Sequence, residues 1–316
     1  MLSTPRIVIA DPIAAAAEKT LREHAAVQRV AGTRRAELLD AVAHADALIV
    51  RSATTVDRDV FDAASALRVI GRAGVGVDNI DLDAARTRGV AVVNTPTANI
   101  HSACEHAIAL LLAAARHIPA ADASVRGGGW ERSRFQGVEV FGKTVGVIGF
   151  GRVGQLFAER LSAFGTTVVA ADPYPDHEAA QRLGVRIVPL EELMAVSDFV
   201  SVHVPKLPET HGLVDTRLLS HAKPGQILVN AARGGVVDEH ALADALRGGR
   251  IRAAGIDVFE QEPPEDSPLL GLDNVVATPH LGAATAEAQD RAGTDIAHAV
   301  LGVLRGDDAP GVVVKR

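Results

Sequence analysis

Short runs of apolar residues alternate with amphipathic, alanine-rich segments along almost the whole chain. In the first third, the apolar runs predict strands at 6–10, 47–50, 69–71 and 91–93. Helical patterns lie between these runs, at 13–24, 33–43 and 81–88. A second series of fully apolar runs begins at 145 and predicts further strands at 167–171, 199–203, 227–230 and 253–257. This alternation is typical of parallel sheets with helices on both faces.

Two long helical patterns separate the two series and set the expected domain borders. One covers roughly 99–117 and the other about 284–305, after which the residues PGVVVKR predict a closing strand. The fold class that we expect is α/β, with two doubly wound parallel-sheet domains. One domain, at 99–282, would be inserted into a discontinuous domain formed by 1–98 and 283–316.

The segment VGVIGFGRVG, at 145–154, joins a predicted strand to a predicted helix. Its three glycines fit the pattern G-x-G-x-x-G, in which a tight turn and the approach of a pyrophosphate leave no room for a Cβ. The start of the following helix offers N–H groups to the same anion. The residues expected to contact the pyrophosphate are Gly149, Gly151, Arg152, Val153 and Gly154.

The strand that follows this helix ends in Asp172, about twenty residues after the glycines. A carboxylate at this place can accept both hydroxyls of an adenosine ribose, and it would repel the extra phosphate of NADP. The inserted domain is therefore predicted to be a Rossmann domain that binds NAD. A site for S-adenosylmethionine or a mononucleotide also ends a strand with an acid, and it is the alternative.

Three charged residues follow predicted strands of the second series, at the end where ligands of open α/β sheets bind. Arg233 lies in VNAARGGVVDE, Glu262 in DVFEQEPP and His280 in ATPHLGAAT. Hydride transfer needs a base for a hydroxyl proton and a cation for an anionic substrate, and these residue types supply both. Singly, each also fits an ordinary surface or loop residue, but their shared location favours one common site.

The order of these motifs resembles the D-isomer-specific 2-hydroxyacid dehydrogenases over essentially the whole chain. GFGRVG, Asp172, HVPKLPET, NAARGG, DVFEQEPP and TPHLGAAT follow one another in this order. The segments VRSATTVD, VIGRAGVGVDNIDLDAARTRGVAVVNTPTAN and GWERSRF of the first half resemble the members of the family that oxidise phosphoglycerate. The resemblance implies a flavodoxin-like substrate domain, a Rossmann NAD domain and a homodimer.

The resemblance also implies residue roles in hydride transfer. His280 would be the general acid/base, with Glu262 fixing its tautomer, and Arg233 would hold the substrate carboxylate. Asp257 would bond the nicotinamide carboxamide. The other NAD contacts implied are those of His203, Val204, Pro205, Thr210, Ala231, Arg233, His280 and Gly282.

Residues of the first domain would bind a small anionic 2-hydroxy or 2-keto acid. The resemblance implies that a loop made of Gly74, Val75 and Gly76 offers backbone amides to the substrate carboxylate. The residues expected near a substrate phosphate are Arg51, Ser52 and Arg72, with Arg132 or Arg134 from a neighbouring subunit.

The reaction implied is the NAD-dependent oxidation of 3-phospho-D-glycerate to 3-phosphohydroxypyruvate, the first step of L-serine biosynthesis. Two alternatives are a reductase of glyoxylate, hydroxypyruvate or another 2-keto acid, and an NAD-sensing corepressor or scaffold. A phosphate-free substrate has little use for Arg51, Arg72 and Arg132 together, which favours phosphoglycerate. The chain ends at Arg316, directly after the predicted closing strand, so a C-terminal regulatory domain with serine feedback is not expected.

Composition narrows the remaining function classes. The net charge of −7 gives no electrostatic reason to expect a nucleic acid or a membrane as partner, and the longest apolar stretch, AIALLLAAA, is too short to span a bilayer. The only cysteine, Cys104, excludes an internal disulfide and fits a cytoplasmic protein. We expect no metal site, because His101 and Glu105 share a helical face without a visible third ligand, and the resemblance makes Glu105 and His106 structural.

Overall fold

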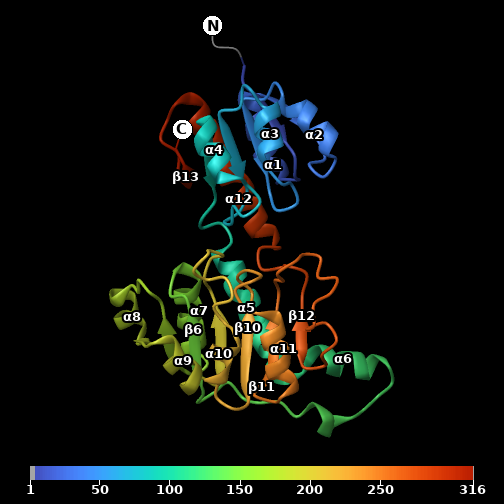
Figure 1. Cartoon of the computed structure of the whole chain (residues 1–316), viewed down its shortest axis with the longest axis vertical. Helices are drawn as coiled ribbons and strands as arrows, with labels where there is room; N and C mark the ends of the chain where they lie inside the picture. Colours follow the sequence, from blue (N-terminus) through green and yellow to red (C-terminus); the bar gives the residue numbers. More distant parts are fainter. Residues whose placement is uncertain (1–3, 316) are drawn as a thin grey trace. The chain divides into compact units, whose positions relative to one another are not determined.

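The computed structural model describes residues 4–315, which form two compact units. The first unit comprises the residues up to Asn99 together with those from Ala283 onward, and the second comprises Ile100–Gly282. The chain returns to the first unit with its last long helix, α12, and its last strand, β13 (Figure 1). The predicted fold class, an α/β domain inserted into a discontinuous α/β domain, is confirmed.

A six-stranded sheet in the order β13-β5-β4-β3-β1-β2 forms the centre of the first unit. Neighbouring strands are parallel except β13, which runs antiparallel to β5. The order of β1 to β5 is that of a flavodoxin-like sheet. The elements are β1 (Arg6–Ile9), α1 (Ala15–His24), β2 (Ala26–Arg29), α2 (Arg35–Val42), β3 (Ala47–Val50), α3 (Arg58–Ala63), β4 (Val69–Arg72), α4 (Leu82–Arg88), β5 (Ala91–Asn94), α12 (Ala286–Arg305) and β13 (Val312–Val314).

Alternate residues of each central strand enter different cores. In β1, Ile7 and Ile9 pack in the core that includes residues of α1 and α12, whereas Val8 packs in the core that includes residues of α2, α3 and α4. In a strand, successive side chains point to opposite faces, and here both faces are covered. The strands therefore read as unbroken apolar runs, which is why the sequence predicts them well.

The second unit is built on a seven-stranded, fully parallel sheet in the order β8-β7-β6-β9-β10-β11-β12, which is the Rossmann order (Figure 1). Residues of α5, α7 and α8 form the core on one face, and residues of α9, α10 and α11 form the core on the other. The elements are α5 (Ile100–Arg116), α6 (Ile118–Arg126), the 3-10 helix Arg132–Phe135, β6 (Thr144–Ile148), α7 (Arg152–Ser162), β7 (Thr167–Ala171), α8 (His177–Leu183), β8 (Arg186–Ile187), α9 (Leu190–Val196), β9 (Phe199–Val202), α10 (Thr216–Ser220), β10 (Gln226–Asn230), α11 (Glu239–Arg247), β11 (Ile251–Ile256) and β12 (Val275–Ala277).

The long helix that the sequence predicts over 99–117 ends at Arg116 in the structure. His117 takes a left-handed backbone with φ of 54°, and Pro119 lies in the first turn of the next helix, α6. Within residues 4–315 no single helix is long and apolar enough to cross a membrane. The pair α5 and α6 would pass by length and composition, but the two helices meet at 62°, and seven residues of α5 are buried.

Candidate active site

The glycine turn between β6 and α7 has the geometry that a pyrophosphate requires. Gly149 has φ of 94°, and a Cβ there would lie 2.8 Å from the backbone of His203. A Cβ at Gly154 would lie 2.1 Å from the carbonyl oxygen of Gly149, so the helix could not start where it does. Gly151 faces open space, and as the N-cap of α7 it has no side chain to accept from the first-turn N–H groups. These N–H groups, which begin at Arg152, fit a phosphate.

Asp172, just after β7, links the glycine turn to the segment that follows β7. Its Oδ2 accepts from the N–H of Phe150 at 2.7 Å, and its Oδ1 accepts from the N–H of Tyr174 at 2.8 Å. A carboxylate can accept about four hydrogen bonds, so lone pairs remain for ribose hydroxyls. The bond to Phe150, which the sequence does not reveal, ties the predicted ribose acceptor directly to the phosphate turn.

The loop His203, Val204 and Pro205 follows β9 and forms a wall of the glycine turn. The N–H of His203 donates to the carbonyl of Ile148 at 2.7 Å, and the Val204 side chain lies where a Cβ on Gly149 would reach. Burial lowers the pKa of His203 to about 3, so its ring is neutral, and it packs on Phe157 with 4.8 Å between centroids. Thr210 donates from Oγ1 to the Pro205 carbonyl at 2.6 Å and closes the loop.

Arg233 lies in a turn that directly follows β10. Asn230, the last residue of β10, donates from Nδ2 to the Arg233 carbonyl at 3.0 Å and accepts on Oδ1 from the N–H of Ala232 at 3.1 Å. A Cβ on Gly234 would lie 1.7 Å from the Phe259 carbonyl oxygen, so only glycine permits this close packing. The Arg233 turn is thereby held against the turn that leads to Glu262.

His280 and Glu262, two of the predicted catalytic groups, are in direct contact. His280 Nδ1 lies 2.7 Å from Glu262 Oε2, and Glu262 Oε1 accepts from the N–H of Phe259 at 3.1 Å. Burial would raise the pKa of Glu262, but the hydrogen bonds from His280 and Phe259 hold it below its ordinary value. Since a carboxylate only accepts, Nδ1 carries the proton and Nε2 is left as the basic nitrogen. The adjacent parallel strands β10, β11 and β12 precede Arg233, Glu262 and His280, respectively. The three residues therefore lie beyond the carboxyl ends of these strands, on the same side of the sheet.

Asp257, at the end of β11, is fully buried, and its carboxylate accepts hydrogen bonds from within the chain. One of these comes from the N–H of Gly282, and a Cβ on Gly282 would lie 3.8 Å from the Ala231 carbonyl oxygen. Ala231 and Gly282, both predicted NAD contacts, therefore lie close together. His106 and Thr278, which the sequence did not assign to the site, also bond to Asp257. The predicted contact of Asp257 with the nicotinamide stays a prediction.

In the first unit, the predicted substrate loops are held by buried polar groups. Asp11, which is 5% exposed, accepts on Oδ2 from the N–H of Arg51 at 2.6 Å and on Oδ1 from Thr54 Oγ1 at 2.8 Å. Ser52, between them, is exposed. This carboxylate holds the backbone from which the Arg51 side chain extends, and Asp11 was not among the predicted site residues.

The second substrate loop of this unit runs from Arg72 to Gly76. Gly74 has φ of 150°, and a Cβ there would collide with the Arg72 guanidinium at 1.6 Å. Asn94 donates from Nδ2 to the Val75 carbonyl at 2.6 Å. The glycine at 74 thus leaves room for Arg72, and Asn94 holds the loop at Val75.

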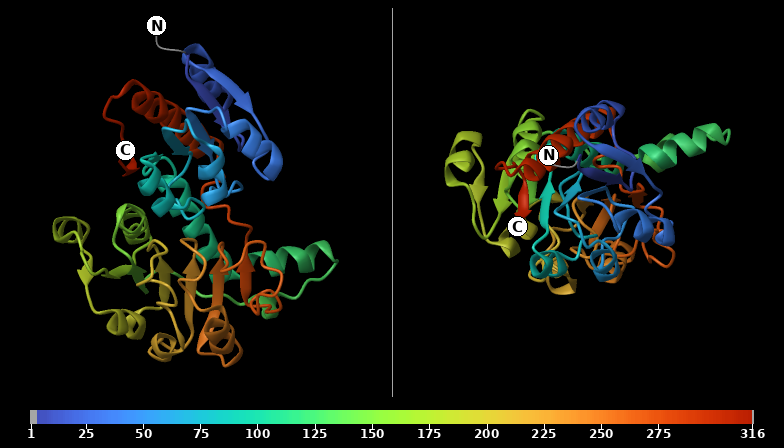
Figure 2. Two further views of the ribbon diagram at one scale, coloured as in Figure 1. Left: turned by 45° about the horizontal axis from the view of Figure 1, so that its top comes forward. Right: turned by 90° about the horizontal axis from the view of Figure 1, so that it is seen from above.

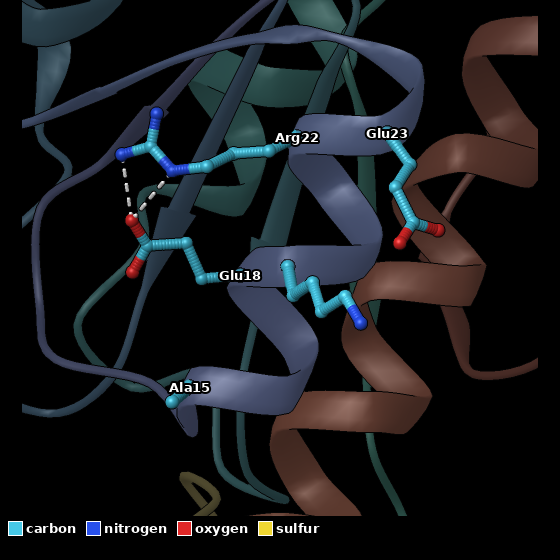
Figure 3. A pocket seen from close by; sticks show the side chains of 5 residues that line it. Ala15, Glu18, Arg22 and Glu23 are labelled. Carbon is cyan, nitrogen blue, oxygen red and sulfur yellow. Dashed lines mark hydrogen bonds and ion pairs between the residues drawn. The ribbon is translucent and has the colours of Figure 1, made fainter.

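Arg132 and Arg134 lie in the second unit, on the exposed 3-10 helix that follows α6, where Arg134 pairs with Glu131 at 3.2 Å. Their predicted contribution from a neighbouring subunit stays a prediction. A shallow pocket of the first unit runs along α1 and contains none of the predicted substrate residues (Figure 3). Its residues are Ala15, Glu18, Lys19, Arg22 and Glu23.

Cys104 is buried in α5, and His101 and Glu105 of the same helix contact Arg160. Burial raises the pKa of the Cys104 thiol to about 11, which leaves it unreactive near neutral pH. Arg160 lies 3.1 Å from Glu105 Oε1 and 3.3 Å from His101 Nδ1, so this pair is engaged with a cation. Among the residues that the structure describes, no group of three His, Cys, Asp or Glu side chains could hold a metal ion.

Comparison with known proteins gives matches over both units. The family model described as "D-isomer specific 2-hydroxyacid dehydrogenase, NAD binding domain" matches residues 108–282. D-3-phosphoglycerate dehydrogenase of Mycobacterium tuberculosis is 59% identical over 312 residues, and that of Methanocaldococcus jannaschii is 49% identical over 309 residues. These matches cover 99% and 98% of this chain but 59% of each relative, so the chain spans about three fifths of their length.

Solved structures of similar proteins cover the whole fold. The TT0316 protein from Thermus thermophilus superposes with a TM-score of 0.90 at 38% identity, over 98% of this chain and all of that one. The NAD-dependent formate dehydrogenase of Staphylococcus aureus in complex with NAD superposes with a TM-score of 0.88 at 29% identity, over 98% of this chain and 99% of that one. The D-lactate dehydrogenase of Escherichia coli gives a TM-score of 0.86 at 27% identity, over 98% of this chain and all of that one.

Proposed function

The chain belongs to the D-isomer-specific 2-hydroxyacid dehydrogenase family and carries its NAD-binding domain, and from this premise we propose that it oxidises 3-phospho-D-glycerate to 3-phosphohydroxypyruvate with NAD, the first step of L-serine biosynthesis. The observation that carries the chemistry is the 2.7 Å contact between His280 and Glu262. The choice of substrate is supported by the likeness to D-3-phosphoglycerate dehydrogenases over 99% of the chain.

The residues of the second unit divide the work of hydride transfer. The glycine turn and Asp172 would hold NAD, which would supply the acceptor for the hydride that leaves C2. His280 Nε2 takes the C2 hydroxyl proton, and Glu262 stabilises the imidazolium that results. The Arg233 guanidinium would bind the substrate carboxylate in a bidentate way. The hydrogen on C2 would leave as hydride with the C2–H electron pair, the hydroxyl proton would pass to His280, and the O–H electron pair would form the second bond of the C2 carbonyl.

For the substrate phosphate, the groups that we propose are cations and backbone amides. Arg51, Ser52, Arg72 and the loop of Gly74, Val75 and Gly76 come from the first unit. Arg132 or Arg134 would be supplied by a second copy of the chain. Each charged contact to phosphate contributes about 1.5–3 kcal/mol, so two of them favour a phosphorylated substrate by about 100-fold or more.

We further propose that the chain forms a homodimer in the cytoplasm, with neither nucleic acid nor membrane as a partner. The support is α6 and the segment after it, which extend from the body of the second unit (Figure 2). No residue of α6 is buried, and Ile118, Val125 and Trp130 are 56%, 54% and 73% exposed. A second copy would cover this apolar surface. Sedimentation of the wild type and of Trp130→Ser tests the proposal, which fails if the wild type is a monomer.

A substrate panel tests the proposed reaction. NADH formation is followed with 3-phosphoglycerate, D-glycerate, D-lactate and glycolate, with hydrazine present to trap the keto product. We expect the highest kcat/KM with 3-phosphoglycerate, and His280→Ala should abolish turnover but keep NADH binding. Preference for a phosphate-free acid would instead support the 2-keto acid reductase. NADH-dependent self-association without turnover would support the NAD-sensing scaffold.

A further inference from the structure

Three consecutive backbone N–H groups in the turn that carries His280 all donate to one residue, Asp257. The N–H of His280 donates to the Asp257 carbonyl at 2.8 Å. The N–H of Leu281 donates to Oδ1 at 2.7 Å, and that of Gly282 donates to Oδ2 at 2.8 Å. Asp257 is fully buried. The path of the turn therefore depends on where this carboxylate lies and on its staying ionised.

His280 needs this anchorage because its backbone lies in the left-handed region, with φ of 56°. A side chain with a Cβ adopts that conformation at a cost, and it persists only where the surrounding contacts impose it. If the bonds to Asp257 weakened, the backbone of His280 would relax toward a more favourable region. Its imidazole would then leave Glu262.

Two side chains complete the shell of Asp257 Oδ1. Thr278 donates from Oγ1 at 2.6 Å, and His106 Nε2 lies 3.0 Å from both Oδ1 and Thr278 Oγ1. His106 comes from α5, 151 positions earlier in the chain, and its side chain is 19% exposed. Since the carboxylate only accepts, Nε2 carries the shared proton. Burial would raise the pKa of Asp257, but the hydrogen bonds from His106, Thr278 and Leu281 lower it.

We propose that His106 is a positioning residue for His280 and that it acts through Asp257. By donating Nε2–H into a buried carboxylate, it satisfies that charge and fixes the oxygen that also receives the N–H of Leu281. The inference rests on the proposed function, because it assigns His106 to the same proton transfer. The feature that the turn requires of His106 is its N–H donor, and its volume alone would not serve.

Two substitutions separate the donor from the volume. His106→Leu fills the same space with an apolar side chain and removes the N–H donor. His106→Gln keeps an N–H donor at a similar reach from the backbone. The matched control is His101→Leu, on the same helix, where the histidine is exposed and contacts Arg160.

We expect His106→Leu to lower kcat with 3-phosphoglycerate by about tenfold or more and to leave KM for NAD within about twofold. Hydrogen exchange at the amides of Leu281 and Gly282 should become about tenfold faster, while the amides of β10 keep their protection. His106→Gln should retain most of the wild-type kcat and most of the protection at these two amides. His101→Leu should match the wild type in both.

The inference would be overturned if His106→Leu had the same kcat as the wild type and the same exchange rates at the amides of Leu281 and Gly282. It would also be overturned by a His106→Gln variant as impaired as His106→Leu, or by a general loss of protection that includes β10. If the wild-type chain does not oxidise 3-phosphoglycerate, the proposed function fails. Exchange at Leu281 and Gly282 in the two variants still decides whether His106 holds the turn.

Discussion

Replacing Glu262 by glutamine should slow hydride transfer, because it removes the charge that faces His280 and keeps an acceptor in place. Glu262 Oε2 lies 2.7 Å from His280 Nδ1, and Oε1 accepts from the N–H of Phe259 at 3.1 Å. Glutamine is nearly isosteric with glutamate, and its carbonyl oxygen can still accept from His280. The variant therefore tests the charge apart from the hydrogen bond.

The size of the effect follows from the difference between charged and neutral hydrogen bonds. A hydrogen bond to a charged group contributes about 1.5–3 kcal/mol and a neutral one about 0.5–1.5 kcal/mol. The side chains of His280 and Glu262 are 44% and 38% exposed, so solvent screening keeps the difference near its lower end, at about 1 kcal/mol. The charge acts when the imidazolium forms, and kcat should fall about fivefold.

Steady-state NADH formation from 3-phosphoglycerate, with hydrazine as the trap, measures this loss, and NADH titration should show unchanged cofactor binding. Glu260→Gln is the matched control, because Glu260 lies in the same loop but is 59% exposed and pairs with His211 at 3.4 Å. If Glu262→Gln and Glu260→Gln have the same kcat, stabilisation of the imidazolium by Glu262 is refuted.

The pKa of Glu262 also gives the sign of a pH effect on stability. Burial would raise this pKa, but the hydrogen bonds from His280 and Phe259 hold it below the ordinary value of 4.5. The ionised carboxylate therefore contributes stability above that value, and the contribution is lost as the pH falls through the lower pKa of the folded state. The difference in Tm between wild type and Glu262→Gln should be steady near neutral pH and shrink below pH 4.5.

Three further substitutions or treatments have defined outcomes. Gly154→Ala should destabilise the chain by about 1–3 kcal/mol in thermal unfolding, since its Cβ would lie 2.1 Å from the Gly149 carbonyl; Gly271→Ala, with open space around it, is the control. Asp172→Ala should weaken NAD binding about tenfold or more and reduce the preference for NAD over NADP. KM values for both cofactors measure this, and an unchanged ratio of the two would contradict the role of Asp172 as the ribose acceptor. Cys104 should resist alkylation at pH 8 in the folded chain and react in urea, because burial raises its pKa to about 11; rapid labelling without urea would show that the thiol is accessible.

The central strands of both sheets could be predicted from the sequence because helices cover both of their faces. Burial on both sides leaves an unbroken apolar run, as in β3 and β9. The short strands β2 and β8 gave no such signal. Both lie at sheet edges, where β2 is mostly exposed and carries polar residues, and β8 has only two residues. A pattern search depends on burial, and these strands have little of it.

The candidate ligand-binding groups could also be selected from the sequence, since glycine patterns and charged residues after strands are local features. Their buried partners could not. His106 and Asp257 are 151 positions apart, and Asp11 reaches Thr54 across 43 positions. Neither contact leaves a periodicity or a spacing that a single sequence could show, because only the packing of one element on another brings the atoms together.

The structure shows a common arrangement at the ends of β10 and β11. Asn230, at the end of β10, and Asp257, directly after β11, are buried polar residues, and the side chain of each bonds the backbone of a later turn. The turns bonded in this way are those that carry Arg233 and His280. A substitution at Asn230 or Asp257 should therefore alter kcat through the position of the charged group, even if neither side chain touches the substrate. Residues proposed to contact the reacting atoms are thus distinct from the residues that position them. The positioning residues can be assigned only from the three-dimensional structure of the turns.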